Sequence, residues 1–498
     1  MSAQIAMSAQ LAILQVLVPL LAAPLCLVIS RASYVWVFSL IAGVICFVIS
    51  VLLLQQVSQF GPISYSLGGW QAPIGVEYRI DTLSAYLLMI VSAISCVVLL
   101  AARTSINREI SERKHAPFYV LYMMCLAGML GIIATGDVFN LFIFVEIAAL
   151  SSYALIAMGQ DRRALTASLS YLLVGTLGAT FILIGIGLMY MATGTLNMAD
   201  LSERLVNVAE SRTLLTAFAF FLVGVCLKLA LFPLHWWLPN AYAYAPSITS
   251  TLLAATATKV AIYILLRFVF SVFGLELSFS LLPLQNILLA LGIVGILVAS
   301  IMAIYQQNVK QLLAYSSVAQ IGYMMLTLGL LNITGLMATL LHVFNHALMK
   351  GALFLALTAV MYRTGGVQLK HFSGLGKTMP WTMAAVVIGG VSLIGIPLTV
   401  GFISKWYMLK ASLENGWWPI AVVILVGSLL AAIYVWRIIE AAYFRPSINA
   451  DKNVNEAPLT ILIPVWLLSL ANLYFGIDAD LSVSISESAA RSLFLGEL

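Results

Sequence analysis

The sequence predicts an all-α polytopic membrane protein, and three observations support this. Of the 498 residues, 62% are hydrophobic and 9% are charged, and the mean hydropathy is +1.05. A soluble domain carries roughly 25% charged residues, so a water-soluble fold is excluded. Apolar runs of about 20 residues, each long enough to cross a bilayer, recur along the chain. The runs lack the alternation of a membrane β-barrel, which leaves a helical bundle.

The apolar runs predict about 14 transmembrane helices. The first begins near Leu11 without a basic segment before it or a cleavage site after it, so we expect it to be retained. Gly61 to Arg79 predicts a small hairpin-like loop, and Asn197 to Arg212 predicts a short amphipathic helix at the interface. The helix centres are expected near residues 20, 44, 92, 126, 149, 180, 223, 259, 295, 321, 347, 393, 430 and 466.

Basic residues in the short loops predict the orientation of the chain, because cytoplasmic loops carry an excess of Lys and Arg. Loops after even-numbered spans hold few of them, chiefly Arg79, Arg204, Arg212 and Lys410. Both termini are therefore expected outside the cytoplasm. Loops after odd-numbered spans hold Arg31, Arg103, Arg108, Arg113, Lys114, Arg162, Arg163, Lys310, Arg363, Lys370, Lys377, Arg445 and Lys452.

Two predicted spans contain breaks at comparable places in the two halves of the chain. The seventh has Pro233 and Pro239. The twelfth has Pro397 between Gly395 and Lys405. Breaks five spans apart indicate two inverted five-helix repeats, with helices 7 and 12 broken; each proline taken alone is also typical of an ordinary kink. The predicted division is 1–115 for helices 1–3, 116–272 for helices 4–8, 284–445 for helices 9–13, and 446–498 for helix 14 and a tail.

Several ionisable side chains fall inside the predicted spans, where a charge costs roughly 2.5 to 3.5 kcal/mol on insertion scales. A marginally stable protein does not keep such groups without a use for them. They are Glu146, Lys228, Lys259, Lys350 and Lys405, joined by His342 and His346, with Arg437 and Glu440 near the end of the thirteenth span.

Glu146 is the one acid between residues 138 and 158. It either packs as a neutral carboxyl group or forms an ion pair with Lys228, the lysine beside the first break. Burial and pairing shift protonation equilibria in opposite directions, so separating such a pair switches its protonation state. A pair of this kind has the property that a proton gate requires.

His342, His346 and Lys350 share one stripe of a helix, about 12 Å long. Histidines four residues apart can bind a metal, but no acid or cysteine lies nearby in that span, so we expect no metal site. Ordinary buried histidines are the alternative, and Lys405 could be a lysine that extends to the interface. Together with Lys259, these groups predict a lateral proton path without a cofactor.

The cysteines and the net charge indicate no further chemistry. The net charge of +5 is dispersed along the chain, so no nucleic-acid partner is expected. The cysteines lie in apolar runs without the paired spacing of a zinc or iron-sulfur site, and we interpret them as buried hydrophobes. They are Cys26, Cys46, Cys96, Cys125 and Cys226.

Five ordered motifs between about residues 80 and 445 resemble the antiporter-like subunits of respiratory complex I and of Mrp-type Na+/H+ antiporters. The Gly-Asp-Val-Phe-Asn-Leu block and the Ile-Ser-Lys-Trp-Tyr run around Lys405 look most like the D subunits of the Mrp-type antiporters. The five motifs are the block from Gly136 to Glu146, the run Lys228 to Pro239, the run Lys310 to Gly322, Asn345-His-Ala-Leu-Met-Lys350, and the run Gly395 to Lys405.

The resemblance implies 14 helices, inverted repeats and a proton path. By motif, Glu146 would pair with Lys228, and Lys259 would be the connecting lysine. His342 and His346 would continue the line, and Lys405 would be its terminal lysine. One departure is Gln320, at a position where the family often has histidine; an amide hydrogen-bonds but does not titrate near neutrality, which puts a proton-carrying role there in doubt.

We therefore expect a proton-translocating membrane subunit of a multisubunit Na+/H+ antiporter, a secondary transporter in the plasma membrane of a prokaryote. Its expected partners are other subunits of a hetero-oligomeric complex, protons, Na+ and the lipid bilayer. The alternative is a proton-pumping subunit of a complex I or membrane-bound hydrogenase type redox complex. A scaffold without transport is disfavoured, because it gains nothing from Lys228 or Lys259.

Overall fold

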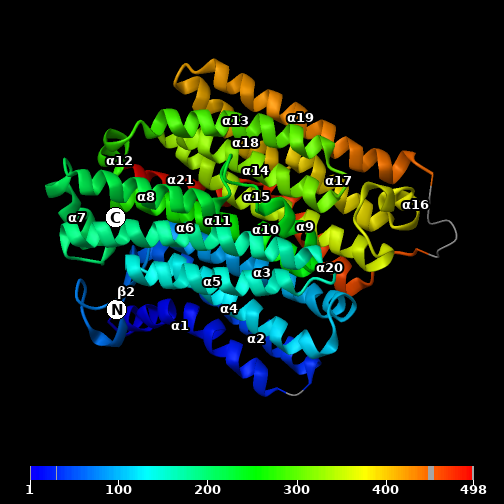
Figure 1. Ribbon diagram of the computed structural model, residues 1–498, viewed down its shortest axis with the longest axis horizontal. Helices are drawn as coiled ribbons and strands as arrows, with labels where there is room; N and C mark the ends of the chain where they lie inside the picture. Colours follow the sequence, from blue (N-terminus) through cyan, green and yellow to red (C-terminus); the bar gives the residue numbers. More distant parts are fainter. Residues whose placement is uncertain (1, 30, 447–453, 496–498) are drawn as a thin grey trace.

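The computed structural model describes residues 2–29, 31–446 and 454–495, so Lys452 lies outside the described residues. The chain forms one bundle whose long helices run roughly side by side, with α15 near its centre (Figure 1). Two strands, β1 (Ile63–Ser66) and β2 (Glu77–Ile80), form the predicted hairpin, with Ile63 opposite Ile80. The predicted interfacial helix is α7 (Met198–Leu205).

The long helices match the predicted spans. They are α1 (Ser2–Val28), α2 (Ala32–Phe60), α3 (Thr82–Glu109), α4 (His115–Ala134), α5 (Val138–Ala157), α6 (Arg163–Thr193), α8 (Arg212–Leu229), α10 (Ser247–Ala255) with α11 (Ala257–Leu266), α13 (Leu284–Tyr305), α14 (Val309–Leu328), α15 (Ile333–Thr364), α17 (Pro380–Ile394) with α18 (Val400–Glu414), α19 (Trp418–Phe444) and α20 (Leu459–Ile477). The shorter helices are α9 (Leu238–Tyr244), α12 (Leu275–Leu281), α16 (Leu375–Thr378) and α21 (Asp480–Leu495).

Twelve described segments are helical, long and apolar enough to cross a membrane. Two further predicted spans complete the expected set. One is α14, which is more polar, and the other is divided into α17 and α18. The predicted fold class and approximate helix number are therefore confirmed. The predicted division into 1–115, 116–272, 284–445 and 446–498 stays a prediction.

Both expected breaks are present. The first follows α8, where Ala230 adopts a left-handed conformation with φ of 58°, before α9 begins. The second separates α17 from α18, with φ of 89° at Gly395 and 71° at Leu398. A third interruption, at Thr256 between α10 and α11, was not predicted. No proline or glycine marks it; Thr256 itself donates to the Leu252 carbonyl, 2.6 Å away.

The segment predicted as a tail contains a helix, α21. Its residues Ala489, Ala490 and Leu493 are buried, and it packs against α15 and α3. Ser486 Oγ lies 3.3 Å from the hydroxyl oxygen of Tyr86 on α3. The helix was missed because its serine-rich sequence resembles a polar tail, whereas its small residues allow close packing against α15.

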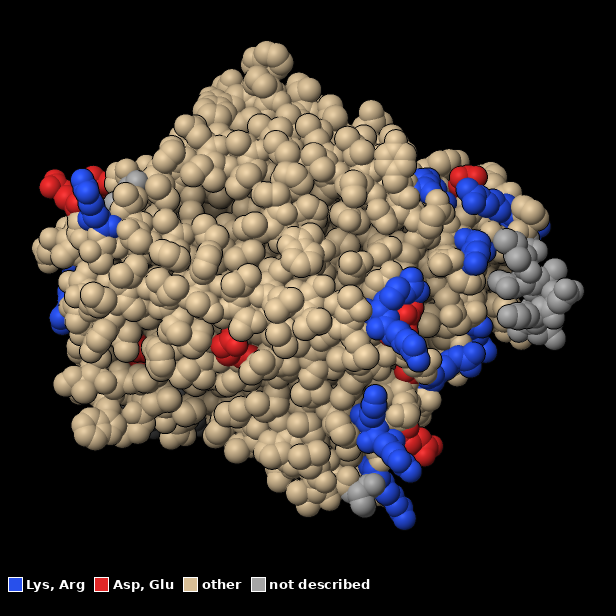
Figure 2. Space-filling view, viewed as in Figure 1, with Lys and Arg blue, Asp and Glu red and all other residues tan. Residues whose placement is uncertain are grey.

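Charge is distributed unequally between the two ends of the bundle. The start of α1 and the end of α21 lie at the end that also holds α7 (Figure 1). Lys and Arg side chains gather at the opposite end, beside α16, and a broad middle band of the visible face is almost free of charge (Figure 2). This is the distribution expected of a protein whose middle is in contact with lipid.

Candidate functional site

The first predicted pair is formed between α5 and α8. Lys228 Nζ lies 3.6 Å from Glu146 Oε1, with 8% of the lysine side chain and 24% of the glutamate side chain exposed. Neither atom has a hydrogen-bond partner among the described residues. Lys228 lies in the last turn of α8, two residues before the left-handed Ala230. The pair is therefore an ion pair of loose geometry, held by charge rather than by a fixed set of hydrogen bonds.

A small cavity lies beside Lys228, between α5 and α11. It has a volume of about 50 Å³ and is lined by Lys228, by Ser152 of α5 and by Thr258 of α11. Its lining is mostly apolar, but its volume is sufficient for a water molecule, and Lys228, Ser152 and Thr258 supply polar groups that such a water could contact. Thr258 in turn accepts a hydrogen bond from Lys259 Nζ, at 3.4 Å. Lys228 thus lines the cavity directly, whereas Lys259 is linked to it through Thr258.

Lys259 is fully buried and is positioned by the interruption at Thr256. Its Nζ donates to the Ala254 carbonyl oxygen at 2.6 Å. Ala254 lies in the last turn of α10, where carbonyl groups lack helical partners and carry the negative end of the helix dipole. The break therefore supplies the acceptor that holds this lysine.

The two histidines lie on α15, which is buried along its whole central part. Their rings are stacked, with centroids 6.0 Å apart and planes 4° from parallel. His346 is fully buried, and neither ring nitrogen has a partner among the described residues. Buried polar atoms are nearly always hydrogen-bonded, so His346 is a position where water is expected.

His342 has a partner at each ring nitrogen. Nε2 lies 2.8 Å from Gln320 Oε1, and Nδ1 lies 2.8 Å from Ser404 Oγ. An amide oxygen only accepts, whereas a serine hydroxyl group both donates and accepts. Nδ1 can therefore accept from Ser404 when the ring is neutral and donate to it when the ring is protonated. The arrangement accommodates both charge states, and Gln320 serves as a fixed acceptor.

Lys405 ends the line at the second break. Its Nζ donates to the carbonyl oxygens of Leu393 and Ile394, at 3.1 and 2.8 Å, and to Ser428 Oγ at 2.8 Å. The two carbonyl groups belong to the last turn of α17. The ammonium group also lies 5.0 Å from the centre of the Tyr323 ring, within range of a cation–π contact.

Other predicted charges lie beside this line rather than in it. Lys350 Nζ donates to the Leu313 carbonyl oxygen at 2.7 Å and to Ser316 Oγ at 2.5 Å, both on α14. Arg437 donates to the Gln306 carbonyl oxygen at 3.1 Å. Glu440 is paired with Arg445, 3.2 Å away. Arg437 and Glu440 lie on α19, and this helix contacts Lys405 through a different residue, Ser428.

Sequence reasoning missed a second buried ion pair. Arg267, in the π-helical segment η4 (Arg267–Val272), donates to both oxygens of Asp81, at 2.6 and 2.8 Å. Ser84 joins the cluster at 3.0 Å from Arg267, and Tyr263 links it to the Ile133 carbonyl oxygen at 2.8 Å. The spacing of Lys259, Tyr263 and Arg267 at i, i+4 and i+8 was the available signal.

Lys310 was expected in a loop, but it is buried, with 3% exposure. Its Nζ donates to the Ala245 carbonyl oxygen, 3.1 Å away, at the end of α9. Lys259 and Lys405 also bind helix-terminal carbonyl groups. Such carbonyl groups stabilise a cation, so three buried lysines share one mode of stabilisation.

The arrangement places titratable groups in sequence across the bundle, from the Glu146–Lys228 pair through Lys259 and the histidines to Lys405. No cluster of three or more His, Cys, Asp or Glu side chains that could hold a metal occurs among the described residues. Chemically, the line can accept, hold and release protons, and its charges are close enough to influence one another through a medium of low dielectric constant.

Comparison with known proteins places the chain in a family. The family model described as NADH:quinone oxidoreductase/Mrp antiporter, transmembrane region, matches residues 135–431. The chain belongs to this family. The matched range contains every residue of the line described above, and the resemblance inferred from the five motifs is thereby confirmed.

Individual relatives come from both branches of the family. The N subunit of NADH-quinone oxidoreductase from Desulforudis audaxviator is 39% identical over 96% of this chain and 98% of that protein. The D subunit of the Na(+)/H(+) antiporter from Alkalihalophilus pseudofirmus is 31% identical over 94% of each. A chain in the structure of the Mrp complex from Dietzia sp. superposes with a TM-score of 0.89, at 25% identity and 98% coverage of both chains.

Proposed function

We propose that the chain is the proton-translocating membrane subunit of a multisubunit Na+/H+ antiporter. Protons would move along the buried line from Glu146 and Lys228 through Lys259, His346 and His342 to Lys405. The observation that carries this proposal is the loose Glu146–Lys228 pair, whose lysine lines a small cavity together with Thr258, the partner of Lys259. A change in the 3.6 Å separation between Lys228 and Glu146 would alter the electrostatic potential at Lys259. The protonation of the histidines would then change in turn.

Glu146 also supports the proposed need for partner subunits. Its side chain is 24% exposed, and it belongs to an α5 face on which Phe139, Ile143 and Leu150 are exposed as well. A carboxyl group directed at lipid is costly. A neighbouring subunit that covers this face would remove that cost, so we assign the α5 face to a contact inside a hetero-oligomeric complex.

The alternative is a proton-pumping subunit of a redox complex, and the 39% identity to a NADH-quinone oxidoreductase subunit favours it. The two functions predict different partners. Affinity purification of the native complex, followed by mass spectrometry, separates them. Mrp-type membrane subunits support the antiporter, whereas flavin or iron-sulfur subunits support the redox complex and overturn the first proposal.

We assign the protein to the plasma membrane of a prokaryote, with the α16 end of the bundle in the cytoplasm and the starts of α1 and α3 at the outside. The gathering of Lys and Arg at the α16 end supports this orientation. A cysteine placed in the exposed β1–β2 turn should then react with an impermeant maleimide in whole cells. Reaction only after the membrane is opened would reverse the assignment.

Transport itself is tested with Lys228→Met in the complete complex, in inverted vesicles that report proton movement by a dye. Lys410→Met is the matched control, because Lys410 forms a similarly loose pair, 3.8 Å from Glu414, but on an exposed surface. We expect Na+-dependent proton exchange to be lost in the first variant and kept in the second. Full exchange in an assembled Lys228→Met complex would refute the proposed path.

A further inference from the structure

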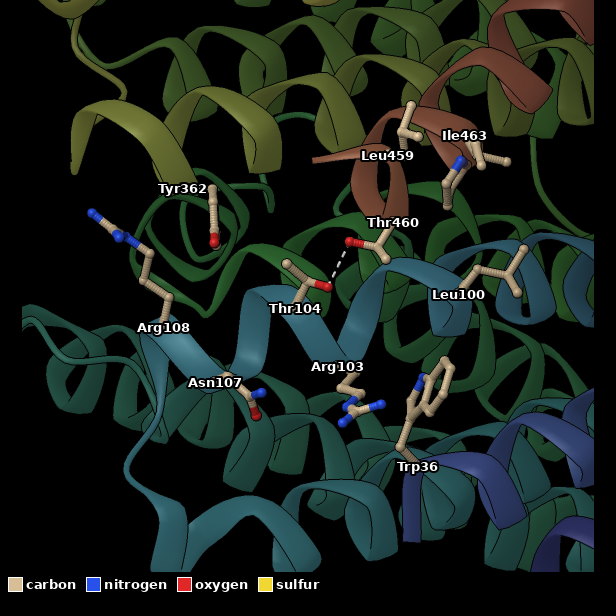
Figure 3. Close-up of a pocket in the computed structure, with 11 residues that line it drawn as sticks. Trp36, Leu100, Arg103, Thr104, Asn107, Arg108, Tyr362, Leu459, Thr460 and Ile463 are labelled. Atoms are coloured by element: carbon tan, nitrogen blue, oxygen red, sulfur yellow. Dashed lines mark hydrogen bonds between the residues drawn. The ribbon is translucent and has the colours of Figure 1, made fainter. Parts of the chain in front are cut away.

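A groove between α3 and α20 combines a basic entrance with an apolar floor. Its entrance is a cavity of about 660 Å³ lined by Arg103, Thr104 and Arg108 of α3, Trp36 of α2, Tyr362 of α15 and Ile463 of α20 (Figure 3). No carboxylate is among the described side chains that line it. The groove lies apart from the line of titratable groups.

The two arginines are available to an anion. Both are exposed, and neither forms an ion pair with a described carboxylate. Arg103 lies over the Trp36 ring, 5.6 Å from its centre, and donates to Ser33 Oγ at 3.1 Å. Arg108 lies over the Tyr362 ring at 5.1 Å. The aromatic rings therefore orient two guanidinium groups while most of their donors stay free.

The same two helices line a further cavity toward the middle of the bundle. A second cavity, of about 340 Å³, is lined by Ile90 and Val97 of α3 and by Leu467 and Ala471 of α20. Because the two helices are antiparallel, these residues follow directly after those of the entrance. The hydroxyl oxygens of Thr104 and Thr460, 2.7 Å apart, join the two helices at the entrance.

The dimensions and the chemistry fit a phospholipid. From Arg103 to Ile90 the groove runs about 20 Å along α3, at 1.5 Å per residue, which is the depth of one leaflet with its phosphate region. Trp and Tyr beside the arginines are typical of the membrane–water interface. A free phosphate ion would bind the arginines but would leave the apolar floor of the groove empty, where Ile463 is 54% exposed.

We propose that this groove binds one anionic phospholipid, with its phosphate in the entrance cavity that Arg103 and Arg108 line and its acyl chains along α3 and α20. Charge complementarity selects an anionic headgroup over a zwitterionic one, and the predicted cytoplasmic position of the entrance matches the leaflet in which anionic lipids attract basic residues. Such a lipid would fill the space between α2, α3, α15 and α20 without blocking the proposed proton line.

Fluorescence quenching tests the proposal on the purified complete complex. The probes are phosphatidylglycerol and phosphatidylcholine with brominated acyl chains, and the signal of Trp36 is the difference between the wild type and Trp36→Phe. We expect saturable quenching by phosphatidylglycerol and at least tenfold weaker binding of phosphatidylcholine. Equal binding of the two lipids, or no quenching of Trp36, would refute the site.

Two arginine variants and one control sharpen the result. Arg103→Gln and Arg108→Gln should each weaken phosphatidylglycerol binding about fivefold, from about 1 kcal/mol per basic residue at an anionic surface. Arg113→Gln is the matched control, because Arg113 is exposed nearby but outside the cavity, and it should bind as the wild type does. Unchanged binding in both arginine variants would overturn the assignment of the phosphate position.

Competition with inorganic phosphate distinguishes a lipid site from a simple anion site. We expect millimolar phosphate to leave the quenching by phosphatidylglycerol unchanged, because phosphate cannot replace the acyl chains on the apolar floor of the groove. Displacement of the lipid by phosphate alone would refute lipid recognition. If an arginine variant fails to assemble, the ratio of the two lipids on the wild type still decides the proposal.

Discussion

The two broken spans hold their lysines in different ways. Lys228, at the first break, has no hydrogen-bond partner among the described residues and lies 3.6 Å from a carboxylate. Lys405, at the second break, donates to two carbonyl oxygens and one serine within 3.1 Å. Three acceptors match the three protons of an ammonium group. The first lysine thus depends on a partner that can move, whereas the second is held by backbone that is fixed.

This difference suggests a division of roles in the proposed path. A charge held mainly by one movable carboxylate responds to any change in that carboxylate, so the Glu146–Lys228 end is suited to receive a signal. A charge held by helix-terminal carbonyl groups keeps its position, so the Lys405 end is suited to define where the line stops. The histidines between them, with a hydroxyl group on one side of His342, are suited to both charge states.

The largest effect is expected when the carboxylate is removed. Glu146→Gln keeps the shape of the side chain but leaves Lys228 as an unpaired buried cation, and loss of one partner of a buried pair costs about 3 to 5 kcal/mol. Proton exchange by the complex in inverted vesicles should fall to background. Glu414→Gln, which breaks the exposed pair with Lys410, is the control and should be fully active. Proton exchange at the wild-type rate in Glu146→Gln would show that the Glu146–Lys228 end does not differ from the Lys405 end in this way.

Lys405→Arg tests whether the second lysine must release its proton. Arginine preserves the positive charge and can still donate to the carbonyl groups of Leu393 and Ile394, but it does not deprotonate in proteins. We expect normal assembly and melting temperature together with at least tenfold slower exchange, about 1.4 kcal/mol. Lys405→Ala should be inactive as well, while Lys405→Glu is expected to retain part of the activity. Wild-type rates in Lys405→Arg would reduce Lys405 to a fixed charge.

A smaller effect is expected from Gln320→Leu. The variant removes the acceptor at His342 Nε2, and a buried donor without a partner costs about 1 to 3 kcal/mol. The histidine signals in an NMR spectrum should shift, and exchange should slow by about five- to tenfold, which corresponds to the lower end of that energy range. Gln311→Leu serves as the control, because Gln311 bonds Asn240 at an exposed position on the same helix. No change at His342 would show that Gln320 does not set its tautomer.

The smallest effect is expected from Ser428→Ala. It removes one of three acceptors around Lys405 Nζ, and a hydrogen bond contributes about 0.5 to 1.5 kcal/mol. The two carbonyl groups remain, so exchange should slow about two- to tenfold without loss of the complex. A complete loss of exchange would show that the serine, rather than the break, positions Lys405.

Much of the fold and of the candidate site could be predicted, because the length of an apolar segment and the charges inside it are visible in the sequence itself. Segment length and the position of proline do not depend on neighbours, so the spans and the breaks after α8 and α17 were predictable. The break at Thr256 was not, since no proline or glycine marks it. The helix α21 was missed because its serine-rich sequence resembles a polar tail, and the role of its small residues appears only in their packing against α15.

The sequence by itself determined that this chain is a membrane bundle with a few charged residues deep inside it. An apolar run, and a charged residue within it, can be recognised without knowing what either one contacts. Only the tertiary structure decided how those charges are stabilised. Lys259, Lys310 and Lys405 bind carbonyl groups at helix ends. Asp81 pairs with Arg267, which lies 186 residues away in the sequence. Such partners are brought together by the packing of helices, and sequence spacing does not record that packing.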